Sequence, residues 1–362
     1  MVAAAYSVKS DRIKRLSEAI RYHRWMLRGH RENRIKFLEQ RAGQHFGDSG
    51  LNSKRVPANL LHLAASVYQY HLFPGTPRVT IDSDIRSLKP IAANRGLVMN
   101  MLLDEIDFGG TMRICGLDGI FGMGIVATGL MRFGDVEIGG ELMDPGQPYA
   151  RRVDENDWVH DTLASEYQDV QFAGHRIEVP LDWAQSYKGF KASVRDKLTS
   201  MVRRIGDKEA GDPKAISQRA GQDATRYYDT TEIWCMWCPR DKTVVILPCG
   251  YDGDPPDESL MEVDFDGPEG GPYDILGFGD MPDQVHPLPP AANLYDMHLM
   301  ANEVLRKCAR QAEQSKRGMA FRSNQKGDAR KYAEFADGQA FYVDDPTTGK
   351  PVVAGGIDQL NL

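Results

Sequence analysis

Charge is distributed along the chain in long blocks of alternating sign. Residues 1–55 hold 13 Lys and Arg against 5 Asp and Glu, a balance of +8, and residues 239–291 hold 2 against 12, a balance of −10. A helical pattern then begins at Asn293, and residues 303–331 hold 9 against 3, a balance of +6. An acidic body that gathers positive charge on one helix and the loop after it is predicted to present that stretch to a polyanion.

Length and composition set further bounds. The 362 residues favour two or three subdomains, and an apolar share of 41% allows a sizeable core. Five cysteines at irregular spacings indicate reduced thiols in a reducing compartment. No apolar run of signal-peptide length precedes the first charges, and the most apolar stretch, residues 114–131, is broken by five glycines and Asp118. We therefore expect a protein made in the cytosol that does not enter a membrane.

Hydrophobic periodicity predicts a series of helices before the basic one. They cover residues 8–46 (with a kink or split at Gly29), 57–73 (with Pro57 in the first turn), 88–107, 110–121 and 179–204. Apolar residues of the second and third helices are expected to face the core. These are Leu60, Leu61, Ala64, Val67, Tyr68 and Leu72, and then Ile91, Val98, Met101, Leu102 and Ile106.

Strand patterns lie between these helices, so the expected fold class is α+β. Strands are predicted over residues 78–82, 125–133 and 151–161, with a hairpin of residues 232–238 and 243–248 around Pro239-Arg-Asp-Lys. Residues 207–225 are polar and predict a mobile loop, whereas the acidic, Pro- and Gly-rich residues 250–291 predict an ordered loop with little regular structure. Residues 319–356 mix a short helix near 328–335 with a strand-like 339–344.

The basic helix, predicted over residues 293–317 with Gly318 as its C-cap, has the most orderly pattern. A narrow apolar stripe is formed by Leu294, Met297, Met300 or Ala301, Val304, Cys308 and Ala312. The cations of its C-terminal half are Arg306, Lys307, Arg310, Lys316 and Arg317. Such a helix is either an ordinary surface helix with a solvated face, or one that packs side by side with copies of itself.

Two other clusters suggest chemistry. Cys235-Met-Trp-Cys238 with Cys249 suggests zinc, but a fourth ligand is missing and strand alternation places the pair on opposite faces, so packing is favoured over a zinc-stabilised adaptor. Asp154, Glu155, Asp157, His160 and Asp161 suggest a metal-dependent nucleic-acid-processing enzyme, although a solvated turn is the simpler interpretation. Gly122-Met-Gly124 follows a helix and precedes a strand, the reverse of a dinucleotide-binding order. We expect no catalytic residue, no metal and no cofactor.

Several segments together resemble the portal proteins of tailed bacteriophages, the head-to-tail connectors. The resemblance covers most of the chain through soft patterns in a matching order. They are Asn33-Arg-Ile-Lys-Phe-Leu, Arg41-Ala-Gly, Asn59-Leu-Leu-His-Leu-Ala-Ala-Ser-Val-Tyr, Pro77-Arg-Val, Leu117-Asp-Gly-Ile-Phe-Gly-Met-Gly-Ile-Val, Trp158-Val-His-Asp161, Glu232-Ile-Trp and Asn293-Leu-Tyr-Asp-Met-His-Leu-Met-Ala-Asn.

The resemblance implies a dodecameric ring at one capsid vertex of the virion, assembled in the host cytoplasm. Residues 1–290 correspond to a wing, 293–317 to a stem helix, 318–356 to a clip and 357–362 to the start of a second stem helix; the rest of that helix, the channel loop and the crown are expected to be absent. The implied partners are double-stranded DNA bound without sequence specificity, the terminase large subunit, a head-tail adaptor and the major capsid protein. Clip candidates for partner binding are Arg322, Lys326, Arg330, Lys331 and Tyr342.

Overall fold

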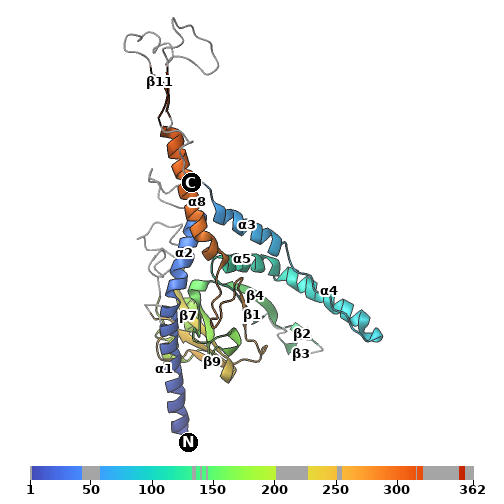
Figure 1. Ribbon diagram of the computed structural model, residues 1–362. Helices are drawn as coiled ribbons and strands as arrows, with labels where there is room; N and C mark the ends of the chain where they lie inside the picture. Colours follow the sequence, from blue (N-terminus) through green and yellow to red (C-terminus); the bar gives the residue numbers. More distant parts are fainter. Residues whose placement is uncertain are drawn as a thin grey trace. The chain divides into compact units, whose positions relative to one another are not determined.

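Helices and antiparallel strands are both abundant in the computed structural model, which confirms the α+β class (Figure 1). It describes residues 2–42, 58–132, 136–138, 141–143, 146–200, 227–250, 255–314, 316–320 and 350–354. The chain divides into a first unit, Met1–Arg55 with Asn59–Asp296, and a second, Val56–Ala58 with Met297–Leu362. The finer assignment to wing, stem and clip stays a prediction.

The N-terminal helical segment is split where the sequence did not predict it. Helix α1 spans Val2–Met26 and α2 spans Arg28–Ala42, so the break lies at Leu27 rather than Gly29. The Leu27 N–H still donates to the His23 carbonyl, at 3.0 Å, and the Leu27 side chain is buried in the core. The break therefore reorients the helix while a buried leucine anchors it.

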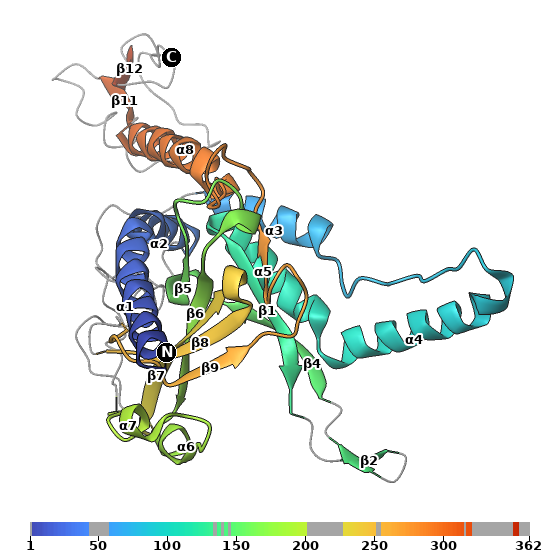
Figure 2. The ribbon, with the colours of Figure 1, turned by 90° about the horizontal axis from the view of Figure 1, so that it is seen from below.

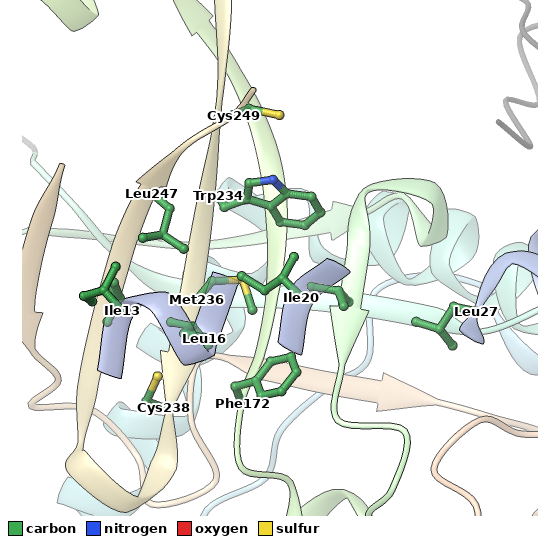
Figure 3. Packing of buried hydrophobic residues seen from close by; sticks show 12 residues of the cluster. Ile13, Leu16, Ile20, Leu27, Phe172, Trp234, Met236, Cys238, Leu247 and Cys249 are labelled. Atoms are coloured by element: carbon green, nitrogen blue, oxygen red, sulfur yellow. The ribbon is translucent and has the colours of Figure 1, made fainter. Parts of the chain in front are cut away.

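A five-stranded antiparallel sheet forms the centre of the first unit, in the order β5-β6-β7-β8-β9. Its strands are β5 (Trp158–His160), β6 (Ala173–Pro180), β7 (Thr230–Cys238), β8 (Thr243–Pro248) and β9 (Met261–Asp264). The predicted β7–β8 hairpin is confirmed. Side chains alternate along β7, and Trp234 and Met236 pack against Ile20 of α1 (Figure 3). Helix α1 thus covers one face of the sheet.

The opposite face packs against a three-stranded antiparallel sheet in the order β10-β1-β4. Its strands are β10 (Tyr273–Leu276), β1 (Gly124–Met131) and β4 (Gln147–Val153), and a short pair β2 (Val136–Ile138) and β3 (Glu141–Met143) lies between β1 and β4 in sequence. Ile125 of β1 shares a core cluster with Trp237 of β7. Val126 points the other way, toward Cys115 of helix α5 (Phe108–Phe121). The layers therefore run α1, five-stranded sheet, three-stranded sheet, α5.

Helices α3 (Leu60–Leu72) and α4 (Lys89–Glu105, after the short 3-10 turn η1 at Arg86–Leu88) lie on the α5 side (Figure 2). Asn59 caps α3 by accepting from the His62 N–H at 2.9 Å. The predicted strand at residues 78–82 is wrong. The N–H and carbonyl of Val79 bond to the side-chain amide of Asn100 at 2.8 and 3.0 Å, in place of a neighbouring strand.

The predicted helix over residues 179–204 is also wrong. Strand β6 continues to Pro180, paired with Thr230 of β7, and only then do two short helices follow, α6 (Leu181–Ser186) and α7 (Ala192–Arg195). The pairing partner is about 50 residues away in sequence, so local periodicity does not reveal it. The strand predicted over residues 151–161 is interrupted by the 3-10 turn η2 (Glu155–Asp157).

Two further predictions need correction. The acidic segment 250–291 contributes β9 and β10 to the two sheets, so it is more regular than expected. The long helix α8 spans Pro290–Gln314 and stops short of Arg317. Lys316–Ala320 forms β11, which pairs with β12 (Lys350–Ala354) and places Gly318 opposite Val352, so Gly318 is no helix cap. Residues 207–225, 328–335 and 339–344 lie outside the described residues.

Candidate functional site

The predicted DNA-facing cations lie on two elements, α8 and β11. Arg306 and Lys307 lie on α8, where Arg306 is half-buried and Lys307 is exposed. Arg310 lies on the same helix, whereas Lys316 and Arg317 belong to strand β11 because that segment pairs with residues 350–354. The clip candidates Arg322, Lys326, Arg330, Lys331 and Tyr342 lie outside the described residues.

Three members of the expected apolar stripe of α8 are exposed in the second unit. Met297, Met300 and Val304 are 56%, 65% and 46% exposed, while His298 and Asn302 are each only 1% exposed. The Asn302 amide accepts from the Ala58 N–H and donates to the Ala58 carbonyl, both at 3.0 Å. Among the described residues of this unit, the buried side chains of α8 are therefore polar, whereas its exposed side chains are the apolar Met297, Met300, Val304 and Leu305 together with Glu303 and Lys307.

Several cations of the basic N-terminal block form ion pairs within the first unit. Arg12 lies 3.1 Å from Asp241, and Arg21 lies 3.6 Å from Asp257. Part of its positive charge therefore pairs with the acidic block of residues 239–291, in ion pairs that stay partly exposed.

Arg34 of α2 is the centre of a buried ionic network. Its guanidinium lies 2.9 Å from Asp118, 3.1 Å from Asp154 and 3.4 Å from Glu155, and its side chain is 3% exposed. Arg152 adds a second cation beside Asp118 and Asp154. Burial alone would raise the pKa of Asp154, but Arg34 and Arg152 outweigh it and lower that pKa to about 2. Two arginines thus pair with three carboxylates, and Arg34 lies buried among them.

The remaining members of the predicted metal cluster are also engaged. Asp157 lies 2.7 Å from Arg176, and Asp161 accepts from the Leu163 N–H at 3.0 Å. The Trp158 indole N–H donates to His160 Nδ1 at 3.0 Å, and burial lowers the pKa of His160 to about 3. In the part of the chain that the structure describes, no group of three or more His, Cys, Asp or Glu is arranged to hold a metal ion. The predicted acidic cluster is therefore an ion-pair network that links α2, α5 and both sheets.

The cysteine motif is divided between the two faces of β7, as strand alternation requires. Cys238 and Cys249 pack in the cluster beneath α1, while Cys235 lies near Tyr149 and Tyr273. Burial raises the pKa of Cys235 to about 12 and that of Cys249 to about 11, so both thiols stay protonated at neutral pH. The interpretation as packing residues is confirmed for Cys238 and Cys249.

Helices α3 and α4 expose most of the residues that the sequence analysis placed in the core, although Leu61 is buried as predicted. On α3 only Leu61 and Ala65 are buried, and on α4 only Ala92 and Gly96. Val98 and Met101 are 64% and 71% exposed. A signal was present: apolar residues of 88–107 surround the helix instead of forming one stripe, which is typical of a helix covered on several sides.

Sequence reasoning missed Arg34, Asp118 and Arg152, the residues that tie the network together. Arg34 and Asp118 are 84 positions apart, and nothing local marks them as partners.

None of the described helices combines the length and apolar character of a membrane span. Compared with known proteins, the chain matches no family model and no curated protein.

Proposed function

We propose that this chain is a subunit of a bacteriophage portal ring, which forms the DNA channel at a capsid vertex. The observation that carries the proposal is the open face of α8. Met297, Met300 and Val304 are exposed on the same helix as the cations Arg306 and Lys307. An exposed apolar stripe favours packing against another surface. Copies of α8 arranged side by side would cover that stripe and repeat its cations around a channel.

The proposed mechanism is electrostatic and needs no catalytic group. A ring that passes duplex DNA needs shallow, salt-sensitive contacts with phosphates and no reading of bases. A few Lys and Arg per subunit, repeated in a dodecamer, supply such contacts without the tight binding that would stall translocation. The terminase large subunit, the head-tail adaptor and the major capsid protein would bind through protein surfaces, with the clip as the proposed platform for the terminase and adaptor.

The alternative, a metal-dependent nucleic-acid-processing enzyme, is less well supported. Its carboxylates would have to bind a divalent cation, yet Asp154 and Glu155 are paired with Arg34, and Asp157 is paired with Arg176. Displacing an arginine from a buried pair costs several kcal/mol, about 3–5 kcal/mol in typical cases.

The first test is negative-stain electron microscopy of the purified full chain, together with native mass measurement. We expect rings with a central channel and a mass that is an integral multiple, near twelve, of the 40.5 kDa chain. A uniform monomer under these conditions would contradict the proposal.

The second test reverses the charge of Arg306, Lys307 and Arg310 to Glu. Rings should form as before, but DNA retention should weaken and lose roughly one unit of its logarithmic salt slope for each phosphate contact removed. The matched control reverses Lys14 and Arg15, exposed cations of α1, and should retain DNA normally. Equal retention by both variants would remove α8 as the DNA-facing element.

A further inference from the structure

Arg306 and Lys307 lie on different faces of α8, although they are neighbours in sequence. His298, Asn302 and Arg306 follow one another at intervals of four residues, so they share one face of the helix. His298 and Asn302 are each 1% exposed. Arg306 Nε is buried as well, and it has no hydrogen-bond partner among the described residues. Arg306 is therefore on the side of α8 that carries the buried side chains.

Lys307 lies on the exposed side of the same helix. It follows Met300 by seven residues, which is about two helical turns. The side chains of Met300 and Lys307 are both 65% exposed. Lys307 follows Asn302 by five residues, which turns it roughly 140° around the helix axis from that buried amide. Of these two cations, Lys307 is therefore the one that presents its charge to a phosphate in solution.

The ammonium group of Lys307 already has an anionic partner. Its Nζ lies 3.2 Å from Oε1 of Glu303, one turn earlier on the same face, and the Glu303 side chain is also 65% exposed. Among the described residues, Glu303 is the one ionic partner of Lys307. A Glu placed four residues before a Lys is the favourable order on a helix. Such an exposed pair is weak, so a phosphate can displace the carboxylate without unfolding anything.

We infer that Glu303 limits how tightly α8 holds DNA, because its carboxylate competes with the phosphates for Lys307. The inference rests on the proposed function, whose DNA contact it regulates. A phosphate that reaches Lys307 must replace Glu303 at the ammonium, and the displaced carboxylate stays nearby as a like charge. Repeated in every subunit of a ring, this competition keeps each contact shallow, as passage of DNA requires.

A double-mutant cycle in the full chain tests the competition. Glu303→Gln, Lys307→Gln and the double variant are compared with the natural chain by the Kd of a short DNA duplex, measured by fluorescence anisotropy over a series of salt concentrations. Glu303→Gln should tighten binding by roughly twofold for each contact, the size expected of an exposed pair. Lys307→Gln should weaken binding and lower the logarithmic salt slope by about one unit for each contact. In the double variant the gain from Glu303→Gln should disappear, because no ammonium is left to compete for.

Two control variants check that the effect belongs to this pair. Glu32→Gln removes the carboxylate of a comparable exposed pair on α2, in which Arg28 Nε lies 2.8 Å from Glu32, and it should leave the Kd for DNA unchanged. Arg306→Gln removes the neighbouring charge on the other face of α8 and should leave the salt slope unchanged. The native mass of each variant shows whether assembly is the same as in the natural chain.

The outcomes separate the inference from the proposed function. If rings form and Lys307→Gln weakens DNA binding, but Glu303→Gln has no effect or the same effect with and without Lys307, the competition is wrong and the portal proposal remains. An unchanged Kd in Lys307→Gln would also overturn the inference. If the natural chain forms no rings but the cycle shows the expected coupling, the competition stands and the portal proposal falls.

Discussion

The molecule has two basic helical regions, and their positive charges are used differently. In α1 and α2, Arg12, Arg21 and Arg34 pair with carboxylates of their own unit, and Arg34 is buried among three of them. In α8, Lys307 is exposed and its ion pair is with Glu303 on the same helix, 3.2 Å away. A block of positive charge in the sequence therefore does not by itself predict a polyanion partner, because the chain can supply the anions.

Burial decides how much each arginine contributes. The Arg12–Asp241 and Arg21–Asp257 pairs have side chains 33–47% exposed, and such pairs contribute about 0–1 kcal/mol. Arg34, at 3% exposure, neutralises charges that would otherwise be buried alone. The comparison between the two basic regions can therefore be tested by substitutions of graded severity.

The largest effect is expected for Arg34→Met. It leaves Asp118, Asp154 and Glu155 with less positive charge in the core, so the free energy of unfolding should fall by about 3–5 kcal/mol. Chemical denaturation monitored by tryptophan fluorescence measures it. Arg28→Met on the same helix removes an exposed i,i+4 pair with Glu32 and should change stability by about 0.5 kcal/mol or less. Equal losses would mean that the network does not hold α2.

Acid should weaken the first unit through its buried histidines. The folded-state pKa of His160 is about 3 and that of His175 about 4, both lowered by burial, against 6.5 when unfolded. Because the unfolded chain binds protons first, stability is full above pH 6.5 and falls as pH drops toward those values.

For His160 the loss at pH 5 is about 2 kcal/mol, at 1.36 kcal/mol per pKa unit. His160→Gln keeps an acceptor for the Trp158 indole and should remove that part of the pH dependence. Unfolding measured at pH 7 and pH 5 tests this, and an unchanged difference between the two would contradict it.

A moderate effect is expected on the covered face of α8. Asn302→Ala leaves the N–H and carbonyl of Ala58 without their amide partner, at a cost of about 1–3 kcal/mol. Hydrogen exchange of the α8 amides should quicken accordingly. Asn302→Asp keeps only the acceptor for the Ala58 N–H, so its exchange rate should lie between those of the natural chain and of Asn302→Ala. Unchanged exchange in both variants would show that the hydrogen bonds between Asn302 and Ala58 do not stabilise α8.

The smallest effect is expected for Lys307→Ala. Its exposed pair with Glu303, with both side chains 65% exposed, should contribute about 0.3–0.5 kcal/mol or less. A thermal unfolding midpoint within error of the natural chain is the expected result. A loss of stability as large as that of Arg34→Met would mean that Lys307 is a structural residue. The contrast between the buried arginine and the exposed lysine would then be wrong.

Local patterns predicted those elements whose signals are local. The β7–β8 hairpin follows from two apolar runs around Pro239-Arg-Asp-Lys, and α3 ends where Pro74 and Gly75 follow. Elements set by distant partners were missed. Residues 181–195 have apolar spacing suited to one helix, but pairing of β6 with β7 extends the strand to Pro180.

The candidate site was predicted in part. Arg306 and Lys307 lie on the expected helix. The sequence did not predict whether the apolar residues of a helix such as α4 face the core or the solvent. Val98 and Met101 were expected to face the core, because the apolar residues of a helix usually pack against other parts of the same chain. Periodicity shows only that an apolar face exists, and not whether that face is covered.

The contacts of α1 also impose an order of events during synthesis. Arg12 bonds to Thr243 and Ser17 to Pro256, partners that follow them by 231 and 239 positions. At about 5–20 residues per second, the ribosome needs roughly 10–50 s to produce those partners. Throughout that interval Ile13, Leu16 and Ile20 have no sheet to cover them. The first helix to be made is thus among the last to be fully buried, once the acidic segment has emerged.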